Sequence, residues 1–361
     1  MASDRRGDRQ AALRRRLAEQ GLDALLVSHS PNVRYLTGFT GSAGLVLVAA
    51  DRTTLITDFR YAEQGPAETR GAAEVVVEQR NLWDRLRGLL DSGPKLRFGF
   101  ERDHVTVRDA ERLAGLERAE PVPSSELVEG LRAVKDRDEV AAIAAAAELA
   151  QAALAELLAS LSVGETEREI AGRLEAGLRR RGSEWHPFQT IVASGPRSAL
   201  PHARASSRPL GRGEWLLLDF GAQLDGYCAD LTRTVVLGTA EPRQREVYGV
   251  VQQAQRVARE GIRPGMAGRE ADALARDLIT AAGFGNAFGH SLGHGLGLEV
   301  HEAPRLAATA EEPLPAGAVV TVEPGIYLEG WGGVRLEDDV HLTADGPHCL
   351  SDGRTELLEI H

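Results

Sequence analysis

The sequence predicts an α/β domain followed by an α+β domain, and three observations support this architecture. The chain has 361 residues, 43% of them hydrophobic, and single cores usually stop growing at roughly 250–300 residues. Short apolar segments alternate with helical ones in the first third, as in a small α/β domain. Two long helical segments then precede strand-rich sequence. We therefore expect domains over residues 1–128 and 129–361.

The N-terminal domain is expected to begin with an amphipathic helix near residues 10–20. Its strands are expected in residues 23–30, on both sides of a turn at Asp51-Arg52, and in residues 73–79 and 96–101. Helical patterns cover residues 81–92 and 105–116. Two prolines and two serines interrupt the pattern in residues 119–136, so we expect the domain to end there.

The C-terminal domain is expected to combine helices with strands. Helical periodicity covers residues 136–162 and 165–181, and a further helical stretch covers residues 244–282. Strands are expected within residues 214–238 and 318–342, which are rich in β-branched residues and turn signals.

Charge and apolar patterning exclude several classes of partner. The formal net charge is −11, whereas binding to nucleic acid or to an anionic membrane needs a basic face. Residues 140–161 are the most apolar helical stretch, but Glu148, Gln151 and Glu156 interrupt it, so we expect a core helix and no membrane span. The charged N-terminus lacks the apolar run of a secretory signal, and there are only two cysteines, so we expect a cytoplasmic protein.

Two aspartates are expected to lie together on one face of a hairpin. Asp225-Gly226 is a dipeptide favoured in two-residue hairpin turns. If it forms the turn, Asp219 pairs with Thr232, and Asp219 and Asp230 become diagonal neighbours about 7–8 Å apart. Two carboxylates this close repel each other unless a cation lies between them. The alternative is that Asp230 only caps a turn and Asp219 is exposed, but the apolar flanks WLLL and LTRTVVL favour burial.

Further carboxylates follow the same pattern later in the chain. Glu323 stands directly after the apolar strand VVTV and before a Pro-Gly pair. In VRLEDDV, Arg335, Glu337 and Asp339 alternate with other residues and share one strand face. Taken alone, that face is more simply explained as an ordinary solvated one.

The segment GHSLGHGLGLEVHE places His290, His294 and His301 among glycines. Glycine disfavours a helix, so we expect a loop or an irregular strand close to another backbone. The following HEAPR is not the zincin helix motif, because Arg305 stands where the second histidine is required. A lone histidine is usually structural, but three histidines combined with four carboxylates on strands favour a shared site.

Together these motifs resemble the metallopeptidase family with the pita-bread fold, which includes aminopeptidase P, prolidase and methionine aminopeptidase. The matching segments occur in order: DFGAQLDGYCADLTRT, GHSLGHGLGLEVHE, VEPGIY and GGVRLEDDV. The preceding RAVKDRDEVAAI is similar to the family's domain-entry helix. NVRYLTGFTGSAG and LITDFRYAEQ resemble the N-terminal domain of the Xaa-Pro peptidases, which methionine aminopeptidases lack. The resemblance implies a creatinase/prolidase-type N-terminal α/β domain before an α+β pita-bread catalytic domain.

The same resemblance implies a site for two divalent metal ions. Its ligands would be Asp219, Asp230, His294, Glu323 and Glu337. Manganese is the first choice, and oxygen-rich ligation with one imidazole also suits zinc, cobalt or iron. By resemblance, a hydroxide shared by the two ions would attack the scissile carbonyl, and Glu323 would also shuttle the proton of the attacking water.

Other residues would line the substrate cleft. His202, His290 and His301 are implied in catalysis and substrate binding, with His301 hydrogen-bonding the substrate carbonyl or the tetrahedral intermediate. Arg335 would orient Glu337 or bind a substrate carboxylate.

The resemblance predicts an aminopeptidase P-like peptidase that cleaves the Xaa-Pro bond at the N-terminus of proline-containing peptides. The close alternative is an Xaa-Pro dipeptidase (prolidase), which must bind the free carboxylate after proline. An arginine is suited to that task, and Arg197, Arg204 and Arg335 are candidates. Arg197 and Ala203 depart from the family pattern, since many members carry Asn and Tyr there.

More remote alternatives are a creatinase-like hydrolase and a non-enzymatic pita-bread binding protein, in which the metal ligands would not all be expected. The family also implies a homodimer, in which the N-terminal domain would serve substrate access and dimerisation.

Overall fold

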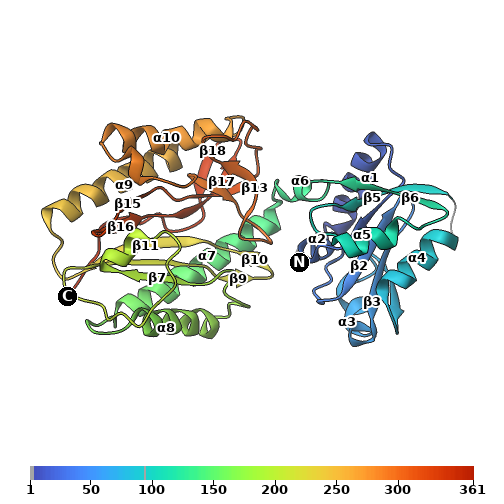
Figure 1. Cartoon of the computed structure of the whole chain (residues 1–361), viewed down its shortest axis with the longest axis horizontal. Coiled ribbons are helices and arrows are strands. Elements are labelled where there is room, and N and C mark those ends of the chain that lie inside the picture. Colours follow the sequence, from blue (N-terminus) through green and yellow to red (C-terminus); the bar gives the residue numbers. More distant parts are fainter. Residues whose placement is uncertain (1–3, 93–94) are drawn as a thin grey trace. The chain divides into compact units, whose positions relative to one another are not determined.

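The computed structural model describes residues 4–92 and 95–361 (Figure 1). The chain divides into two compact units, an N-terminal unit of Met1–Arg132 and a C-terminal unit of Ala133–His361. The division falls a few residues beyond the expected boundary at residue 128, because a short helix, Glu129–Arg132, belongs to the first unit. Arg16 holds the start of this helix by donating hydrogen bonds to the carbonyls of Leu127 and Gly130.

The N-terminal unit is a mixed six-stranded sheet with helices packed against it. Its strands are β1 (Ala24–Val27), β2 (Gly44–Ala49), β3 (Thr53–Asp58), β4 (Glu74–Glu78), β5 (Leu96–Glu101) and β6 (Ala119–Ser124). Its helices are α1 (Arg6–Glu19), α2 (Ser30–Thr37), α3 (Gln64–Thr69), α4 (Leu82–Ser92), α5 (Val107–Leu113) and α6 (Glu129–Arg132), with a 3₁₀ turn at Phe59–Tyr61. The strand order is β4-β3-β2-β1-β5-β6, with β1 antiparallel to β2 and parallel to β5.

Strand β6 lies where the interrupted pattern predicted the end of the domain. Pro121 and Pro123 stand opposite Phe98 and Phe100 of β5. A proline lacks the N–H of a ladder hydrogen bond, so it is confined to edge strands. Since β6 is the edge of the sheet, its prolines are compatible with a strand and oppose the addition of a seventh.

The C-terminal unit has helices α7 (Arg137–Leu158), α8 (Glu167–Arg180), α9 (Pro242–Gly261) and α10 (Gly268–Ala281), with 3₁₀ turns at Gly195–Ala199 and Gly285–Ala287. Its first strands are β7 (Ile191–Ser194), β8 (Trp215–Phe220), β9 (Gln223–Leu224), β10 (Tyr227–Cys228) and β11 (Leu231–Leu237). Its later strands are β12 (Gly293–Gly295), β13 (Glu302–Leu306), β14 (Val319–Val322), β15 (Gly325–Leu328), β16 (Gly332–Arg335), β17 (Asp338–Thr343), β18 (Gly346–Cys349) and β19 (Glu359–Ile360).

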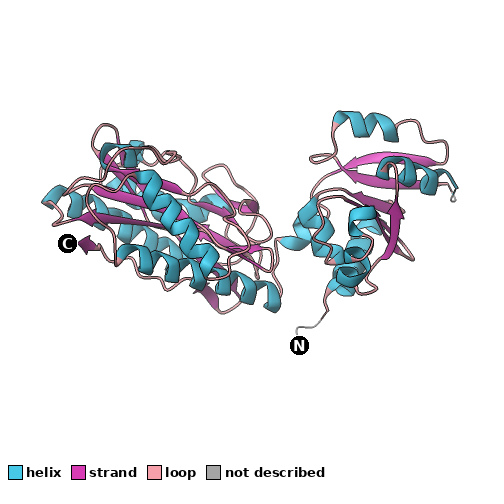
Figure 2. Ribbon diagram, turned by 90° about the horizontal axis from the view of Figure 1, so that it is seen from below, coloured by secondary structure: helices cyan, strands magenta, loops and turns pink. Residues whose placement is uncertain are grey.

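These strands form two main sheets, ordered β19-β11-β8-β7 and β13-β12-β14-β17-β18, and two small hairpins, β9-β10 and β15-β16. Buried side chains of α7 and α8 pack with β7, β8 and β11, and those of α9 and α10 pack with β14 to β17. The strands of this unit therefore lie between two helix pairs (Figure 1), and the view from below shows helices crossing over the strands (Figure 2). This is the α+β arrangement that the sequence predicts.

The helical stretch expected over residues 244–282 is two helices, α9 and α10. Pro264 and Gly265 separate them, and Gly265 has a φ of +87°. A proline removes a helical N–H and clashes with the preceding turn, and a positive φ ends helical geometry. The two helices pack side by side through Ala254, Ala258, Ala271 and Ala275 in one core.

Helix α7 is long and apolar enough to cross a membrane, by length and composition. Its apolar face is nevertheless buried against protein, because Ile143, Ala146, Ala147, Ala150 and Ala153 are all inaccessible to solvent. It is therefore a core helix, as the interrupting polar residues predict.

Candidate metal centre

Asp219 and Asp230 come together through the hairpin that the Asp-Gly dipeptide predicts. Tyr227 pairs with Leu224, and Thr232 pairs with Asp219. Asp225 and Gly226 both have positive φ, +48° and +76°, as a type I′ turn requires. Asp219 and Asp230 are only 8% and 5% exposed, so the exposed alternative for Asp219 is wrong.

His294 lies on β12, an irregular strand whose glycines permit close packing. A Cβ at Gly293 would lie 2.0 Å from the carbonyl oxygen of Thr321, and a Cβ at Gly295 would lie 2.1 Å from that of Ala303. The ladder with β13 shifts register between His294 and Gly295. Glycine is thus required on both sides of His294, which brings its backbone against β14.

Glu337 lies between β16 and β17, and this strand face is buried. Glu337 is 2% exposed and Asp339 is 0% exposed, so the solvated-face alternative is wrong. Asp338 points away from the site and accepts hydrogen bonds from Arg233, Gln255 and Arg259. Arg233 also donates a 2.6 Å hydrogen bond to the Glu337 carbonyl. Arg233 therefore fixes the backbone at Glu337 from the side on which Asp338 lies.

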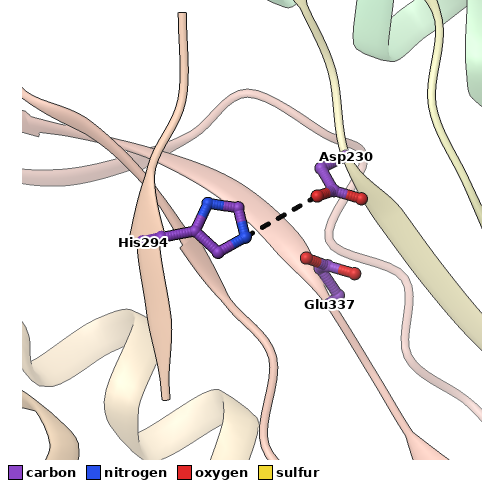
Figure 3. A group of neighbouring side chains, drawn as sticks. All are labelled: Asp230, His294 and Glu337. Atoms are coloured by element: carbon purple, nitrogen blue, oxygen red, sulfur yellow. Dashed lines mark ion pairs between the residues drawn. The ribbon is translucent and has the colours of Figure 1, made fainter. Parts of the chain in front are cut away.

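Three of the five expected ligands form one cluster. Asp230, His294 and Glu337 each offer a ligand atom within 4.8 Å of the others (Figure 3). His294 Nε2 lies 3.8 Å from Asp230 Oδ2 and 3.4 Å from Glu323 Oε1, so Glu323 adjoins the cluster. Asp219 is held differently, because its Oδ2 accepts a hydrogen bond from Arg335.

The carboxylates of this site are electrostatically unequal. Burial raises the pKa of Asp219, Asp230 and Glu337, and the charges of neighbouring carboxylates add to the increase. Burial also acts to raise the pKa of Glu323, but the hydrogen bond and charge of His294 outweigh it, and the result is a lowered pKa. Of the four expected carboxylate ligands, only Glu323 has a lowered pKa, and the site holds an excess of buried negative charge.

The residues present fit a divalent cation. Asp219 Oδ1 and Asp230 Oδ1 are buried and have no hydrogen-bond partner within residues 4–92 and 95–361. A buried carboxylate oxygen without a donor is costly, and a cation would provide the missing partner. Several carboxylates with one imidazole are a donor set suited to divalent transition metals.

Tyr327 is a site residue that the sequence analysis did not identify, although it ends the quoted motif VEPGIY. Its hydroxyl lies 2.9 Å from His290 Nε2 and accepts a 2.8 Å hydrogen bond from Arg335. His290 Nδ1 lies 2.8 Å from the carbonyl of Ser291 and must donate to it, so Nε2 accepts from Tyr327. Burial raises the pKa of Tyr327 to about 12, which keeps this hydroxyl protonated.

The two other expected cleft histidines are accessible to solvent. His301 lies beside the cluster, with its ring centroid 4.3 Å from that of His294. Burial lowers the pKa of His301, and the charges of His294 and His202 lower it further. His202 lies on the loop after the 3₁₀ turn Gly195–Ala199, and both His202 and His301 are exposed residues.

Two of the three arginines considered for substrate binding are already engaged. Arg335 donates to Thr232 Oγ1, to the Pro201 carbonyl, to Tyr327 and to Asp219. Arg197 forms an ion pair with the buried Glu167. Arg204 is exposed.

Both units match known protein families. Residues 9–134 match the Creatinase/Prolidase N-terminal domain, and residues 141–344 match Metallopeptidase family M24. The structure is similar to that of the Xaa-Pro dipeptidase from Bacillus anthracis, with 40% sequence identity, a TM-score of 0.94 and coverage of 98% of this chain and 99% of that one. It is also similar to the X-Pro aminopeptidase from Thermotoga maritima MSB8, with 38% identity, a TM-score of 0.89 and coverage of 96% and 100%.

Sequence similarity extends over the same range. The Xaa-Pro dipeptidase of Pyrococcus horikoshii is 35% identical over 343 residues, which cover 94% of this chain and 95% of that protein. These matches confirm the predicted fold class of a creatinase/prolidase-type domain before a pita-bread domain. The chain belongs to metallopeptidase family M24.

Proposed function

We propose that this protein is a metal-dependent Xaa-Pro dipeptidase (prolidase). The observation that carries the proposal is the buried cluster of Asp230, His294 and Glu337 in a chain of family M24. The sequence favoured an aminopeptidase P-like activity with the dipeptidase as its alternative. The similar proteins favour the alternative, since two of the three described above are Xaa-Pro dipeptidases. Aminopeptidase activity remains the second candidate, supported by the Thermotoga maritima enzyme.

We propose that two divalent ions, manganese as first choice, are held by the expected ligand set: Asp219, Asp230, His294, Glu323 and Glu337. The unpartnered oxygens of Asp219 and Asp230 support this assignment. When bound, the ions supply Lewis-acid chemistry for peptide hydrolysis. Because every expected ligand position is retained, a creatinase-like hydrolase or a binding protein with an eroded site is disfavoured.

The side chains around the ligands would then handle protons and orientation. Glu323 has a lowered pKa beside His294, so it is ionised at neutral pH and can accept a proton from the attacking water. His301, whose ring lies beside that of His294, and the exposed His202 would donate hydrogen bonds to the substrate carbonyl as negative charge develops on its oxygen. Tyr327 and Arg335 would keep His290 and Asp219 in place.

We propose that Arg305 binds the free carboxylate of a dipeptide. It pairs with His294 across the β12–β13 ladder, and directly opposite residues of an antiparallel pair lie on the same face of a sheet. Arg305 is also exposed, whereas Arg335 and Arg197 are engaged in ion pairs. The sequence analysis noted Arg305 only as a departure from the zincin motif. The strand register then placed Arg305 opposite His294.

Substrate length tests the proposed function directly. Purified protein loaded with Mn²⁺ is expected to hydrolyse an Xaa-Pro dipeptide and to leave the tetrapeptide Xaa-Pro-Yaa-Yaa largely intact, as measured by chromatographic detection of the released residue. Cleavage of the tetrapeptide with little action on the dipeptide would support the aminopeptidase candidate. Hydrolysis of neither would contradict both.

Arg305→Gln is expected to reduce kcat/KM for the dipeptide by about 10- to 100-fold, because a charge-assisted hydrogen bond contributes about 1.5–3 kcal/mol. Most of the loss should appear in KM, since the carboxylate is bound equally in the ground and transition states. Arg269→Gln, which removes an exposed arginine paired with Glu311, is the matched control. An unchanged KM in Arg305→Gln would assign carboxylate binding to another residue.

We also propose a cytoplasmic homodimer in which the N-terminal domain serves dimerisation and substrate access. Cys228 and Cys349 are free thiols, which suits a reducing compartment. Light scattering on the purified protein would measure the oligomeric state.

A further inference from the structure

A buried ion pair lies next to the cleft histidine His301, outside the proposed ligand set. Lys135 Nζ and Glu302 Oε1 are 2.7 Å apart, and their side chains are only 1% and 6% exposed. Glu302 directly follows His301 and begins β13. Lys135 belongs to RAVKDRDEVAAI, a motif to which the proposed reaction assigns no role.

Hydrogen bonds on both sides hold the backbone of Lys135 in place. Its N–H donates to the carbonyl of Gly317. The next residue, Asp136, caps α7 and forms a reciprocal capping box with Glu139. The chain contains only two lysines, Lys95 and Lys135, and otherwise uses arginine as its permanent cation. A compact ammonium fits a narrow buried space that a planar guanidinium would overfill.

Glu302 in turn lies against the segment that connects His294 to His301. A Cβ at Gly297 would lie 2.5 Å from Glu302 Oε1 and 2.9 Å from its Cδ. A side chain at this position would displace the carboxylate, so Gly297 lets Glu302 pack directly on this backbone. The carbonyl of Gly297 accepts a 2.8 Å hydrogen bond from the Cys228 N–H, and Gly295 pairs with Glu302 in the β12–β13 ladder. Residues 295–302 are thus held by backbone contacts at Gly295 and Gly297, and by the ion pair with Lys135 at Glu302.

We propose that Lys135 and Glu302 are positioning residues that hold His301 in its catalytic orientation. The inference rests on the proposed function, because it assigns His301 to the substrate carbonyl. Loss of the ammonium would remove the Lys135 charge that stabilises the buried Glu302 carboxylate, and the carboxylate would move toward solvent with the backbone of His301. A displacement of about 1 Å in a catalytic group lowers the rate by about 100-fold.

Two variants test this proposal. Lys135→Met is expected to lower kcat for an Xaa-Pro dipeptide by about 100-fold, with KM and the metal content of the protein little changed. The double variant Lys135→Met/Glu302→Gln removes the negative charge of the carboxylate as well, so it is expected to regain thermal stability while its kcat stays low. Ile170→Ala, a cavity variant in the core around α8, is the control for general destabilisation and should retain kcat.

A merely structural ion pair would give a different result. In that case kcat would return together with the melting temperature in the double variant, and this outcome would overturn the proposal, as would wild-type kcat in Lys135→Met. Should Lys135→Met fail to fold, the double variant alone decides.

Hydrogen–deuterium exchange separates this inference from the proposed function. Peptides covering residues 296–302 are expected to exchange faster in both Lys135 variants than in the wild type, with or without activity. If wild-type protein hydrolyses no Xaa-Pro substrate but this difference in exchange is seen, the proposed function is refuted. The role of the ion pair in holding residues 296–302 is then still supported. Equal exchange in all proteins would refute the inference.

Discussion

Asp230→Asn is expected to abolish metal binding and to lower Xaa-Pro hydrolysis by at least about 1000-fold, because Lewis-acid stabilisation of the transition state contributes several kcal/mol. Asp230 is central to the cluster with His294 and Glu337, and one of its oxygens has no partner among the described residues. Elemental analysis for Mn²⁺ and a dipeptide assay measure the two losses.

The same substitution is expected to make the metal-free protein more stable. Burial raises the pKa of Asp230, and the charges of Glu337 and Asp219 add to the increase. An acid with a raised folded-state pKa binds its proton more tightly in the folded protein, so stability is present at low pH and is lost as the pH rises through that raised pKa. Metal-free wild type should therefore lose stability as the pH rises from the ordinary aspartate range toward the raised pKa of Asp230, and Asp230→Asn should lose less.

Asp225→Asn is the matched control for this prediction. Asp225 lies at the exposed tip of the same hairpin with a positive φ, a conformation that asparagine tolerates. The control should bind metal, hydrolyse the dipeptide and show the pH dependence of the wild type. If Asp230→Asn retained Mn²⁺, or destabilised the metal-free protein, the cluster would not be a cation site.

His301→Ala is expected to lower kcat for the dipeptide by about 100- to 1000-fold, which is the usual cost of removing a donor to a developing oxyanion. The ring is exposed beside His294, and it is not among the proposed ligands. Metal content should therefore be unchanged. KM should change little, because the lost interaction strengthens only in the transition state.

His348→Ala provides the comparison, since His348 is an exposed histidine on β18 and is expected to leave kcat at the wild-type value. Loss of metal from His301→Ala would show that this histidine acts as a ligand. A change confined to KM would show that it only binds substrate.

Local sequence predicted those parts of the site that depend on short-range geometry, namely the aspartate hairpin and the irregular strand around His294. The Asp225-Gly226 turn determined the register that places Asp219 opposite Thr232, and the glycines around His294 indicated an irregular strand. The single helix predicted over residues 244–282 is two helices, separated at Pro264 and Gly265. Strand β6 was not predicted, because prolines suggest a loop unless the strand is known to be at the edge of a sheet.

Residues that act through a distant partner could not be found in this way. Tyr327 contacts His290 and Arg335, and Lys135 contacts Glu302 across most of the C-terminal unit's sequence. Each looks unremarkable among its sequence neighbours, since a tyrosine at a strand end or a lysine before a helix is common. Arg305 gained meaning only when its pairing with His294 was known.

The sequence by itself determined the fold class, the order of the motifs and the face of the hairpin on which two aspartates lie, because turns and strand alternation are set by neighbouring residues. Only the tertiary structure decided that Glu337 is buried, that Arg335 is already paired with Asp219, and that His294 meets Asp230. Those outcomes depend on how separate sheets pack against one another. Burial then converts carboxylates from distant parts of the sequence into one negatively charged cluster, whose mutual repulsion a cation can relieve.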